Sequence, residues 1–404
     1  MRILHTSDWH LGHTLKEQVR GPEHDAFLAW LVAQIADESP DLLLIAGDVF
    51  DAPNPPASAV RAWYRFLLAA HKARPTLTVV VIGGNHDSGA RLDAPSELLG
   101  HFRVHVVGAT PQREDRSIDS AAMLLPIFDD DGRLLARVAA VPYLRPSDLP
   151  GGEDPDRWVD AIRTVYADVF ALAPDDGVPL IAMGHSYMVG GKVSDLSERK
   201  VLGGNLHALP VDIFPERVAY AALGHLHLAQ SVGSRASVRY CGSPIPLALD
   251  ERDYEHQIGV VDLLPAQAAS YRKVPVPRTV AFPRVPAKGS LPLSDLVAEL
   301  LAFPADTRAW IEACVTIGPL DGTARAAVDA AMDHKQARVL AVTTEGGAPT
   351  ASLADVADST SLAELTPADV FEKRWAAVHR DTPMDPLLWS LFHQLVETAS
   401  RSDA

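Results

Sequence analysis

The chain has 404 residues, of which 47% are hydrophobic and 22% are charged, and its formal net charge at pH 7 is −16; this length predicts two or three domains at about 150 residues each. The acidic balance argues against a nucleic-acid coat protein but not against a nucleic-acid enzyme, because bound metal ions supply local positive charge. Cys241 and Cys314 are the only cysteines, so we expect no thiolate metal site. Neither a run of about 20 apolar residues nor a signal-peptide pattern is present. We therefore expect no transmembrane helix and a cytoplasmic location.

Short apolar runs recur along the first 230 residues, and each ends at a polar cluster. The runs lie at residues 3–4, 42–46, 79–82, 180–183 and 220–223. Runs of this length are typical of strands buried on both faces. Apolar residues at helical spacing predict helices around 27–35 and 60–68, the second of them directly after Pro55 and Pro56. The succession of strand, polar loop and helix predicts an α/β layered domain.

The five polar clusters offer oxygen and imidazole donors to a ligand. In chain order they are Asp8-Trp9-His10, Gly47-Asp48-Val49-Phe50-Asp51, Gly84-Asn85-His86-Asp87, Gly184-His185 and Gly224-His225-Leu226-His227. Because ligands of an α/β sheet gather at the carboxyl ends of its strands, we expect all five clusters at one pole. These donors suit two divalent metal ions, and two ions about 3.5–4 Å apart are the usual apparatus for attack at phosphorus. The sequence therefore predicts a phosphoesterase.

Among the cluster residues, Asp48 is the best candidate for a carboxylate that bridges both ions. The other ligands are expected to divide into two sets of three, which are Asp8, His10 and His227 for one ion and Asn85, His185 and His225 for the other. Side chains two residues apart on extended backbone point to the same side, so Asp8 and His10 can converge. Imidazoles combined with oxygen donors suit Mn²⁺, Fe or Zn²⁺ better than Mg²⁺, which prefers nearly all-oxygen shells.

His86 directly follows the expected ligand Asn85, and it is expected to face the substrate. The metal ions would activate a bridging water, and the leaving alkoxide would then need a proton. We therefore expect His86 to act as the general acid or to stabilise the developing charge, with Asp87 orienting its ring. The alternative for His86 is a structural role in packing the loop. For His5 and His13 we expect structural or exposed positions.

After residue 262 the pattern changes to a second, smaller module. Residues 266–286 are rich in proline and small residues. The pattern then predicts a helix, a strand, a helix and a strand at residues 294–301, 309–315, 324–332 and 338–342. A linker follows, and two amphipathic helices are predicted at 367–378 and 386–398. These helices either pack on the parent chain or bind a partner.

The complete set of motifs D-x-H, G-D-x-x-D, G-N-H-D, G-H and G-H-x-H resembles that of the calcineurin-like metallophosphoesterase superfamily. Four segments also resemble the SbcD family, the nuclease subunits of bacterial SbcCD complexes; they lie at residues 5–12, 47–51, 194–199 and 242–247. The resemblance implies a four-layer metallophosphoesterase β-sandwich flanked by helices, with a small α/β capping domain and C-terminal helices.

The resemblance also implies a layout, an activity and partners. The layout is a nuclease domain at 1–270, a DNA-contacting capping domain at 275–345, a linker at 346–364, and helices at 365–404 that bind an ATPase of the SbcC type. The activity is Mn²⁺-dependent, as a double-strand exonuclease and single-strand endonuclease that processes DNA ends and hairpins in replication, recombination and repair. A homodimer within a heterotetramer is implied through residues 57–71 and 91–99. Asp51 stands where archaeal and eukaryotic members carry a second active-site histidine, so its catalytic role is left open.

Two other functions compete with the DNA nuclease. A phosphatase or phosphodiesterase for small substrates would use the same clusters, but it requires neither the second module nor the terminal helices. A non-catalytic scaffold on the same fold would be expected to have lost ligands, whereas every ligand position is filled here.

Overall fold

A computed structural model describes residues 1–149, 154, 157–192, 208–264, 267–316 and 322–345, and four single residues nearer the C-terminus. The chain divides into two compact units, and the first comprises residues 1–314 and 320–343. The motif at 194–199, the linker at 346–364 and all but those four residues of the expected helices at 365–404 lie outside the described residues. Among the helices that are described, none has the length and apolar character needed to cross a membrane.

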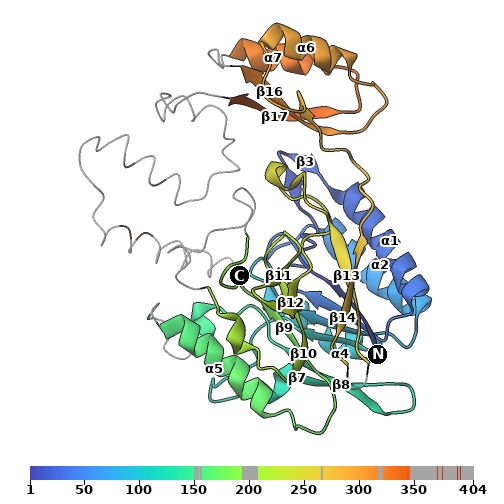
Figure 1. Ribbon diagram of the computed structural model, residues 1–404, viewed down its shortest axis with the longest axis vertical. Helices are drawn as coiled ribbons and strands as arrows, with labels where there is room; N and C mark the ends of the chain where they lie inside the picture. Colours follow the sequence, from blue (N-terminus) through green and yellow to red (C-terminus); the bar gives the residue numbers. More distant parts are fainter. Residues whose placement is uncertain are drawn as a thin grey trace. The chain divides into compact units, whose positions relative to one another are not determined.

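Two six-stranded sheets form the centre of the first unit (Figure 1). From edge to edge, the first sheet consists of β14 (Ser270–Pro275), β13 (Gln257–Asp262), β1 (Arg2–Thr6), β4 (Leu42–Ala46), β5 (Thr78–Ile82) and β6 (Val104–Val107). The second consists of β11 (Gln230–Val232), β12 (Arg235–Tyr240), β10 (Val218–Gly224), β9 (Leu180–His185), β8 (Leu134–Ala140) and β7 (Leu124–Phe128). The run β1-β4-β5-β6 is parallel, as is β12-β10-β9-β8. Their carboxyl ends therefore present loops along one edge of each sheet.

The central strands are buried on both faces, as their sequence predicts. On β4, Leu42 and Leu44 belong to the core that the two sheets share, whereas Leu43 and Ile45 belong to the core beneath the first helices. Each such side chain contributes about 1.5–3 kcal/mol when fully buried. Two-sided burial thus explains why these runs are continuously apolar.

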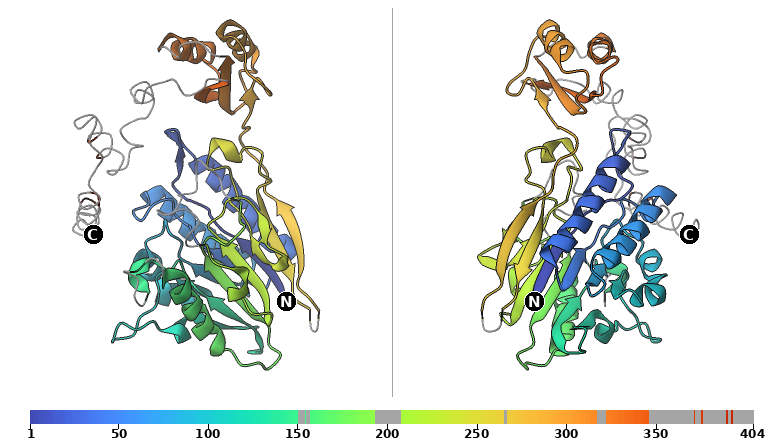
Figure 2. Two further views of the ribbon diagram at one scale, coloured as in Figure 1. Left: turned by 60° about the vertical axis from the view of Figure 1, so that its left-hand side comes forward. Right: turned by 90° about the vertical axis from the view of Figure 1, so that its right-hand side faces the viewer.

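Helices cover the outer faces of both sheets. On the first sheet, α1 (Gly21–Glu38) and α2 (Ala57–Ala73) lie side by side, and α5 (Trp158–Ala171) packs against the second sheet (Figure 2). The order helix, sheet, sheet, helix is the four-layer arrangement that the family resemblance implies. As predicted, α2 begins directly after Pro56, whose fixed φ is compatible with a helix start.

Short elements connect these layers. They are β2 (Thr14–Leu15), β3 (Gln18–Val19), α3 (Gly89–Asp93), α4 (Ser96–Gly100) and the 3₁₀ turns η1 (Ser120–Met123), η2 (Pro146–Asp148), η5 (Val211–Ile213) and η6 (Leu249–Glu251). The last of these turns carries a buried carboxylate, on Glu251, that becomes important at the site.

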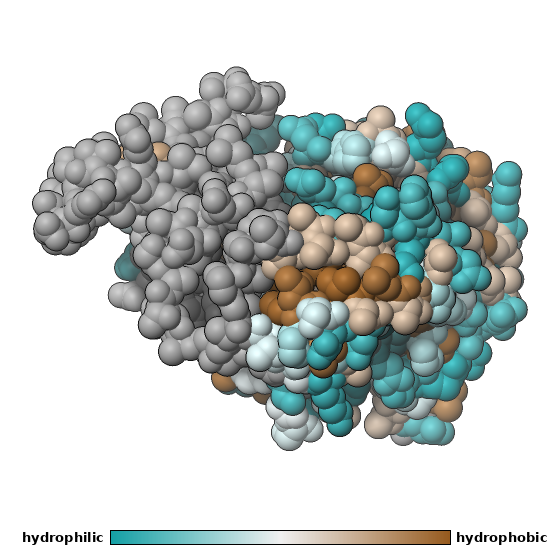
Figure 3. All heavy atoms as spheres, turned by 90° about the horizontal axis from the view of Figure 1, so that it is seen from above, coloured by the Kyte–Doolittle hydropathy of each residue, from teal (hydrophilic) through white to brown (hydrophobic). Residues whose placement is uncertain are grey.

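The smaller module is a three-stranded sheet with two helices. Its sheet has the order β15 (Arg284–Val285), β16 (Trp310–Thr316) and β17 (Arg338–Glu345), and its helices are α6 (Leu293–Ala302) and α7 (Gly322–Ala331). The four elements predicted for this module are all present within a few residues of their expected bounds. Leu296 and Leu300 of α6 are fully buried, whereas Leu301 is 59% exposed. Seen from above, the described surface shows a hydrophobic band bordered by hydrophilic residues (Figure 3).

In the second unit the structure describes four helical aromatic residues, which are Phe371, Trp375, Trp389 and Phe392. The rings of Phe371 and Phe392 stack with centroids 4.1 Å apart, and Trp389 stacks 6.1 Å from Phe371. Phe371 belongs to the first predicted terminal helix, and the other two belong to the second. These three described side chains, from both predicted helices, therefore contact one another.

Candidate metal centre

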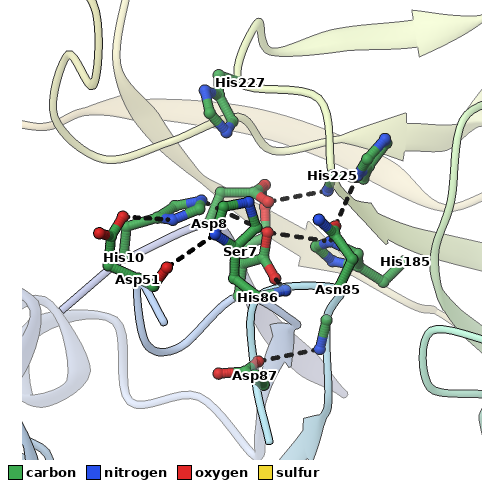
Figure 4. A network of polar contacts seen from close by, with 12 residues as sticks. Ser7, Asp8, His10, Asp51, Asn85, His86, Asp87, His185, His225 and His227 are labelled. Carbon is green, nitrogen blue, oxygen red and sulfur yellow. Dashed lines mark hydrogen bonds and ion pairs between the residues drawn. The ribbon is translucent and has the colours of Figure 1, made fainter. Parts of the chain in front are cut away.

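The structure brings all seven predicted ligands to the carboxyl ends of β1, β4, β5, β9 and β10, and Figure 4 labels all of them except Asp48. Three groups drawn from these side chains and His86 hold their ligand atoms within 4.8 Å of one another; the groups are Asp8, His10 and His227, then Asp8, Asp48 and His185, then His10, Asp48 and His86. Strands from both sheets supply these residues, so the site exists only where the two sheets meet.

Four of the expected ligands have a left-handed backbone. The φ angles of Asp8, His10, Asp48 and His225 are 53°, 47°, 49° and 100°. Such conformations cost about 1–3 kcal/mol each and persist only where the surroundings hold them. The loops are indeed tied together, because the N–H of Asp8 donates to the Gly47 carbonyl and that of His10 donates to the Asp48 carbonyl, both at 3.0 Å. Strain concentrated at these residues is typical of a functional site.

Two glycines before the ligands are required by space. A Cβ atom on Gly84 would lie 2.1 Å from Asp48 Oδ1, and one on Gly47 would lie 2.3 Å from His185 Nδ1. Real Cβ atoms essentially never approach another heavy atom to less than 3.0 Å. The glycines thus allow neighbouring loops to approach one another closely around Asp48.

The Asp48 carboxylate lies between two imidazoles from different sheets. Its Oδ2 atom is 3.3 Å from His185 Nε2 and 3.5 Å from His10 Nε2, and its Oδ1 atom accepts from the His86 N–H at 2.9 Å. Burial alone would raise the pKa of Asp48, but His185 and His10 hold that pKa well below its usual value. Asp48 therefore contacts members of both predicted ligand sets.

The first set, here called the His10 half, consists of Asp8, His10 and His227. The Asp8 carboxylate accepts from the His225 N–H at 2.9 Å, which joins the two sheets. His10 Nδ1 lies 3.2 Å from Asp51 Oδ1, and His227 Nδ1 lies 2.7 Å from Glu251 Oε1. In both rings, therefore, Nδ1 faces a carboxylate, which leaves Nε2 for a ligand.

The second set, here called the Asn85 half, consists of Asn85, His185 and His225. Asn85 Oδ1 lies 2.9 Å from His185 Nε2 and 3.0 Å from His225 Nδ1, and His185 Nδ1 lies 2.8 Å from the Ala46 carbonyl oxygen. Burial, with the neighbouring His185, lowers the pKa of His225 to about 3. Although burial opposes it, Asp48 raises the pKa of His185 to about 9.

A divalent cation fits this constellation. His10 Nε2 is buried and has no hydrogen-bond partner among the described residues, although a carboxylate oxygen lies 3.5 Å away. A buried polar atom without a hydrogen bond costs about 1–3 kcal/mol, unless a ligand satisfies it. The surrounding donors are oxygens and imidazole nitrogens, which are ligands of borderline divalent metals.

His86 lies beside the His10 half. Its ring centroid is 4.7 Å from that of His10, and its Nδ1 atom is 2.8 Å from the Asp51 carbonyl oxygen. This contact fixes the ring through Nδ1 and directs Nε2 away from the carbonyl that holds the ring. His86 is thus oriented by the backbone of Asp51.

Asp87 holds the loops together by a different set of contacts from the one expected. Its carboxylate accepts from three backbone N–H groups at 2.9–3.1 Å, which belong to Val49, Phe50 and Gly84. The expected orientation of the His86 ring by Asp87 is not among these contacts. Burial, with the neighbouring Asp48, raises the pKa of Asp87 to about 6. Asp87 therefore fixes the Asp48 loop against the Asn85 loop.

The Asp51 side chain contacts two histidines. Its Oδ1 atom lies 3.2 Å from His10 Nδ1 and 3.0 Å from His13 Nδ1. Burial would raise the pKa of Asp51, but the bonds to His10 and His13 hold it far below its usual value. The contacts of Asp51 are thus those of a residue that orients a ligand.

Sequence reasoning missed two further residues at the site. His13, for which a structural or exposed position was expected, connects Asp51 to the Leu247 carbonyl, which lies 3.0 Å from His13 Nε2. Glu251 is fully buried and contacts His227. For His13, its position three residues after His10 was a weak signal. For Glu251, the only signal in the nearby sequence was the preceding motif at 242–247.

Comparisons with known proteins show the family of this chain. The model of the calcineurin-like phosphoesterase family matches residues 1–229, and a second model, described as Type 5 capsule protein repressor C-terminal domain (SbcD_C), matches residues 279–379. A curated protein of Rhodobacter capsulatus, named as the D subunit of the nuclease SbcCD, is 43% identical over 320 residues, which cover 76% of this chain and 78% of that protein.

Two further curated relatives carry the same name. The one from Escherichia coli K12 is 33% identical over 412 aligned positions that cover 98% of both chains. The one from Bacillus subtilis is 34% identical over 321 residues, which cover 77% of this chain and 78% of that protein. Since the first family model spans more than half of the chain and the relatives align along most of it, the chain belongs to the calcineurin-like phosphoesterases and, within them, to the SbcD family of nuclease subunits.

Proposed function

We propose that this chain hydrolyses phosphodiester bonds of DNA at a centre for two Mn²⁺ ions. The observation that supports this most is the position of Asp48 Oδ2 between His185 Nε2 at 3.3 Å and His10 Nε2 at 3.5 Å. One carboxylate oxygen between two imidazoles from different sheets is the arrangement that a bridging ligand needs. The mixture of imidazoles and oxygens favours Mn²⁺ over Mg²⁺.

Each half would hold one ion, and Asp48 would be shared. The His10 half contributes one carboxylate and two imidazoles, and the Asn85 half contributes one amide oxygen and two imidazoles. Bound ions supply Lewis acidity, which activates water and neutralises charge on the phosphate. The buried side chains exclude bulk water from the ligands and hold them in place before the substrate arrives.

We assign the proton transfer to His86. With Nδ1 held by the Asp51 carbonyl at 2.8 Å, Nε2 of a protonated ring would be the group that donates to the leaving alkoxide. The position of this ring beside His10 supports a role next to the reacting phosphate.

The relatives are named as components of the SbcCD nuclease, and we extend that assembly to this chain. We propose that the helices at 365–404 bind an SbcC-type ATPase and that the capping domain at 275–345 contacts DNA. A homodimer through residues 57–71 and 91–99 is supported by exposed apolar side chains on α2 and α4, which are Tyr64, Leu68 and Leu98 at 41%, 48% and 64% exposure.

The purified chain should cleave hairpin and linear duplex DNA in the presence of Mn²⁺, with Asp48→Asn as the control for contaminating nuclease. Bis-p-nitrophenyl phosphate, assayed in parallel, measures the basic phosphodiesterase chemistry. Robust turnover of this ester and of small nucleotides with DNA left intact would instead favour the small-substrate phosphodiesterase.

The partner assignment has its own test. A chain that ends at Gly347 should keep its turnover of bis-p-nitrophenyl phosphate but lose the ability to pull down an SbcC-type ATPase. If the shortened chain still binds the ATPase, the terminal helices are not the binding site.

A further inference from the structure

The turn η6 places a carboxylate, on Glu251, against the metal centre. Glu251 is fully buried, with 0% of its surface exposed, and its two oxygens have different partners. Oε1 lies 2.7 Å from His227 Nδ1, and Oε2 accepts from the Leu247 N–H, also at 2.7 Å. Both distances are those of strong, charge-assisted hydrogen bonds.

These contacts determine which nitrogen of His227 is available to a ligand. An ionised carboxylate only accepts hydrogen bonds, so the proton of the neutral ring must sit on Nδ1. The lone pair is then on Nε2, and a ligand atom of His227 lies within 4.8 Å of those of Asp8 and His10. A carboxylate behind an imidazole also makes the ring a stronger ligand.

The position of Glu251 does not depend on its side chain alone. Its N–H donates to the Ala248 carbonyl at 3.3 Å, and its own carbonyl accepts from the Tyr254 N–H at 3.0 Å. The turn is therefore closed by backbone bonds on both sides of the residue. A substitution that keeps the size of the side chain should leave this turn in place.

Glu251 also belongs to a chain of contacts that returns to His10. The Leu247 peptide donates to Glu251 through its N–H, and its carbonyl oxygen lies 3.0 Å from His13 Nε2. His13 Nδ1 in turn lies 3.0 Å from the Asp51 carboxylate, which also contacts His10. Both imidazoles of the His10 half are thus held from behind by one connected network.

We propose that Glu251 is a positioning residue of the metal centre, which fixes the tautomer and orientation of His227 and thereby strengthens the binding of the ion in the His10 half. The inference rests on the proposed two-metal function and extends it to a residue outside the ligand set. Glu251 acts through His227 rather than on the ion or the substrate. The contacts of Glu251 given above run to the His10 half, so we expect the Asn85 half to keep its affinity when Glu251 is changed.

The test compares Glu251→Gln with Glu255→Gln. Glutamine has one acceptor oxygen, so its amide NH₂ must face one of two donors, His227 Nδ1–H or the Leu247 N–H, and one contact is lost. The control residue Glu255 is in the same segment, but its side chain is 53% exposed and pairs with Lys273. Glu251→Ala is a second variant, and circular dichroism with thermal unfolding reports whether each variant folds.

Isothermal titration of the full-length, metal-stripped chain with Mn²⁺ gives the number and affinity of the sites, and turnover of bis-p-nitrophenyl phosphate is measured across Mn²⁺ concentrations. For Glu251→Gln we expect two sites, one weakened about 10–100-fold and one unchanged. The kcat at saturating Mn²⁺ should return toward the wild-type value, because the ligands themselves are intact. Glu255→Gln should match the wild type.

Each result decides between the inference and its alternatives. Two Mn²⁺ sites in Glu251→Gln with wild-type affinities would overturn the role of Glu251 while leaving the two-metal function in place. Equal weakening of both sites would likewise overturn it, because that result indicates a general structural effect. A wild-type chain that binds no Mn²⁺ would overturn the proposed function together with this inference.

Discussion

The two halves of the proposed metal centre contain similar candidate ligands, but these side chains are oriented by different groups. In the His10 half, Nδ1 of His10 faces the Asp51 carboxylate at 3.2 Å and Nδ1 of His227 faces Glu251 at 2.7 Å. In the Asn85 half, Nδ1 of His185 faces the Ala46 carbonyl at 2.8 Å. One half is therefore oriented by charged groups, and the other is oriented by neutral ones.

This difference predicts that two similar sets of ligands bind their metal ions with different affinities. Carboxylates behind imidazoles place negative charge near the ion and increase ligand basicity, whereas a backbone carbonyl mainly fixes the direction of the ring. We therefore expect the His10 half to bind its ion more tightly than the Asn85 half. Asp48, which lies between the halves, should affect both equally.

The largest effect is expected from Asp48→Asn, which removes the shared charge. Mn²⁺ binding should be lost in both halves, and turnover of DNA and of bis-p-nitrophenyl phosphate should fall by about three orders of magnitude or more, since several kcal/mol of charge stabilisation disappear. Titration calorimetry and initial rates measure the two effects. If only one half loses its ion, Asp48 is not the shared ligand.

A smaller effect, on rate alone, is expected from His86→Gln. The kcat for DNA should fall about 100-fold, because the leaving alkoxide loses its proton donor. Mn²⁺ affinity should stay unchanged in both halves. With bis-p-nitrophenyl phosphate the loss should be much smaller, because p-nitrophenolate is stable as an anion; equal losses on both substrates would rule out the acid role.

Asp51→Asn should distinguish the halves directly. The amide oxygen can still accept from both His10 and His13, but the negative charge behind the His10 ring is lost, so the ion of the His10 half should bind about 10-fold more weakly. The backbone carbonyl that holds His86 remains, so kcat at saturating Mn²⁺ should be nearly unchanged. Asp130→Asn, at an exposed carboxylate 57% accessible to solvent, is the matched control. A loss of kcat that excess Mn²⁺ does not restore would indicate a catalytic role for Asp51.

The smallest effect concerns the free energy of unfolding and should leave the difference between the two halves intact. Burial lowers the pKa of His5 on β1 to about 3, against 6.5 for an ordinary histidine. The unfolded chain therefore binds more protons between pH 6.5 and pH 3, so the free energy of unfolding is highest above pH 6.5 and falls as the pH drops through this window. The contribution of His5 is about 1.4 kcal/mol per pH unit at most.

Urea denaturation of the metal-stripped chain between pH 4.5 and pH 7 measures this slope. The slope should be smaller in His5→Gln than in the wild type, and His334→Gln, at an exposed site on the module, should leave it unchanged. An unaltered slope in His5→Gln would show that the protonation of this ring does not contribute to acid sensitivity.

Much of the fold could be predicted from the sequence, because a strand buried on both faces has a continuous apolar run. The runs at 42–46 and 79–82 became β4 and β5 with little change. Strands at the sheet edges, such as β11 and β14, escaped prediction because they are short or partly exposed and do not produce such a run. Their identity depends on pairing with a neighbour, which is a tertiary property.

The sequence alone identified the candidate ligands, because ligands must have particular chemical types and follow strands that end at one pole. It could not determine which groups orient those ligands. Glu251 reaches His227 from 24 positions away in the chain, and the carbonyl of Asp51, which every residue type possesses, holds His86. Such contacts depend on where folded loops meet rather than on a local sequence pattern, so they can be identified only from the tertiary structure.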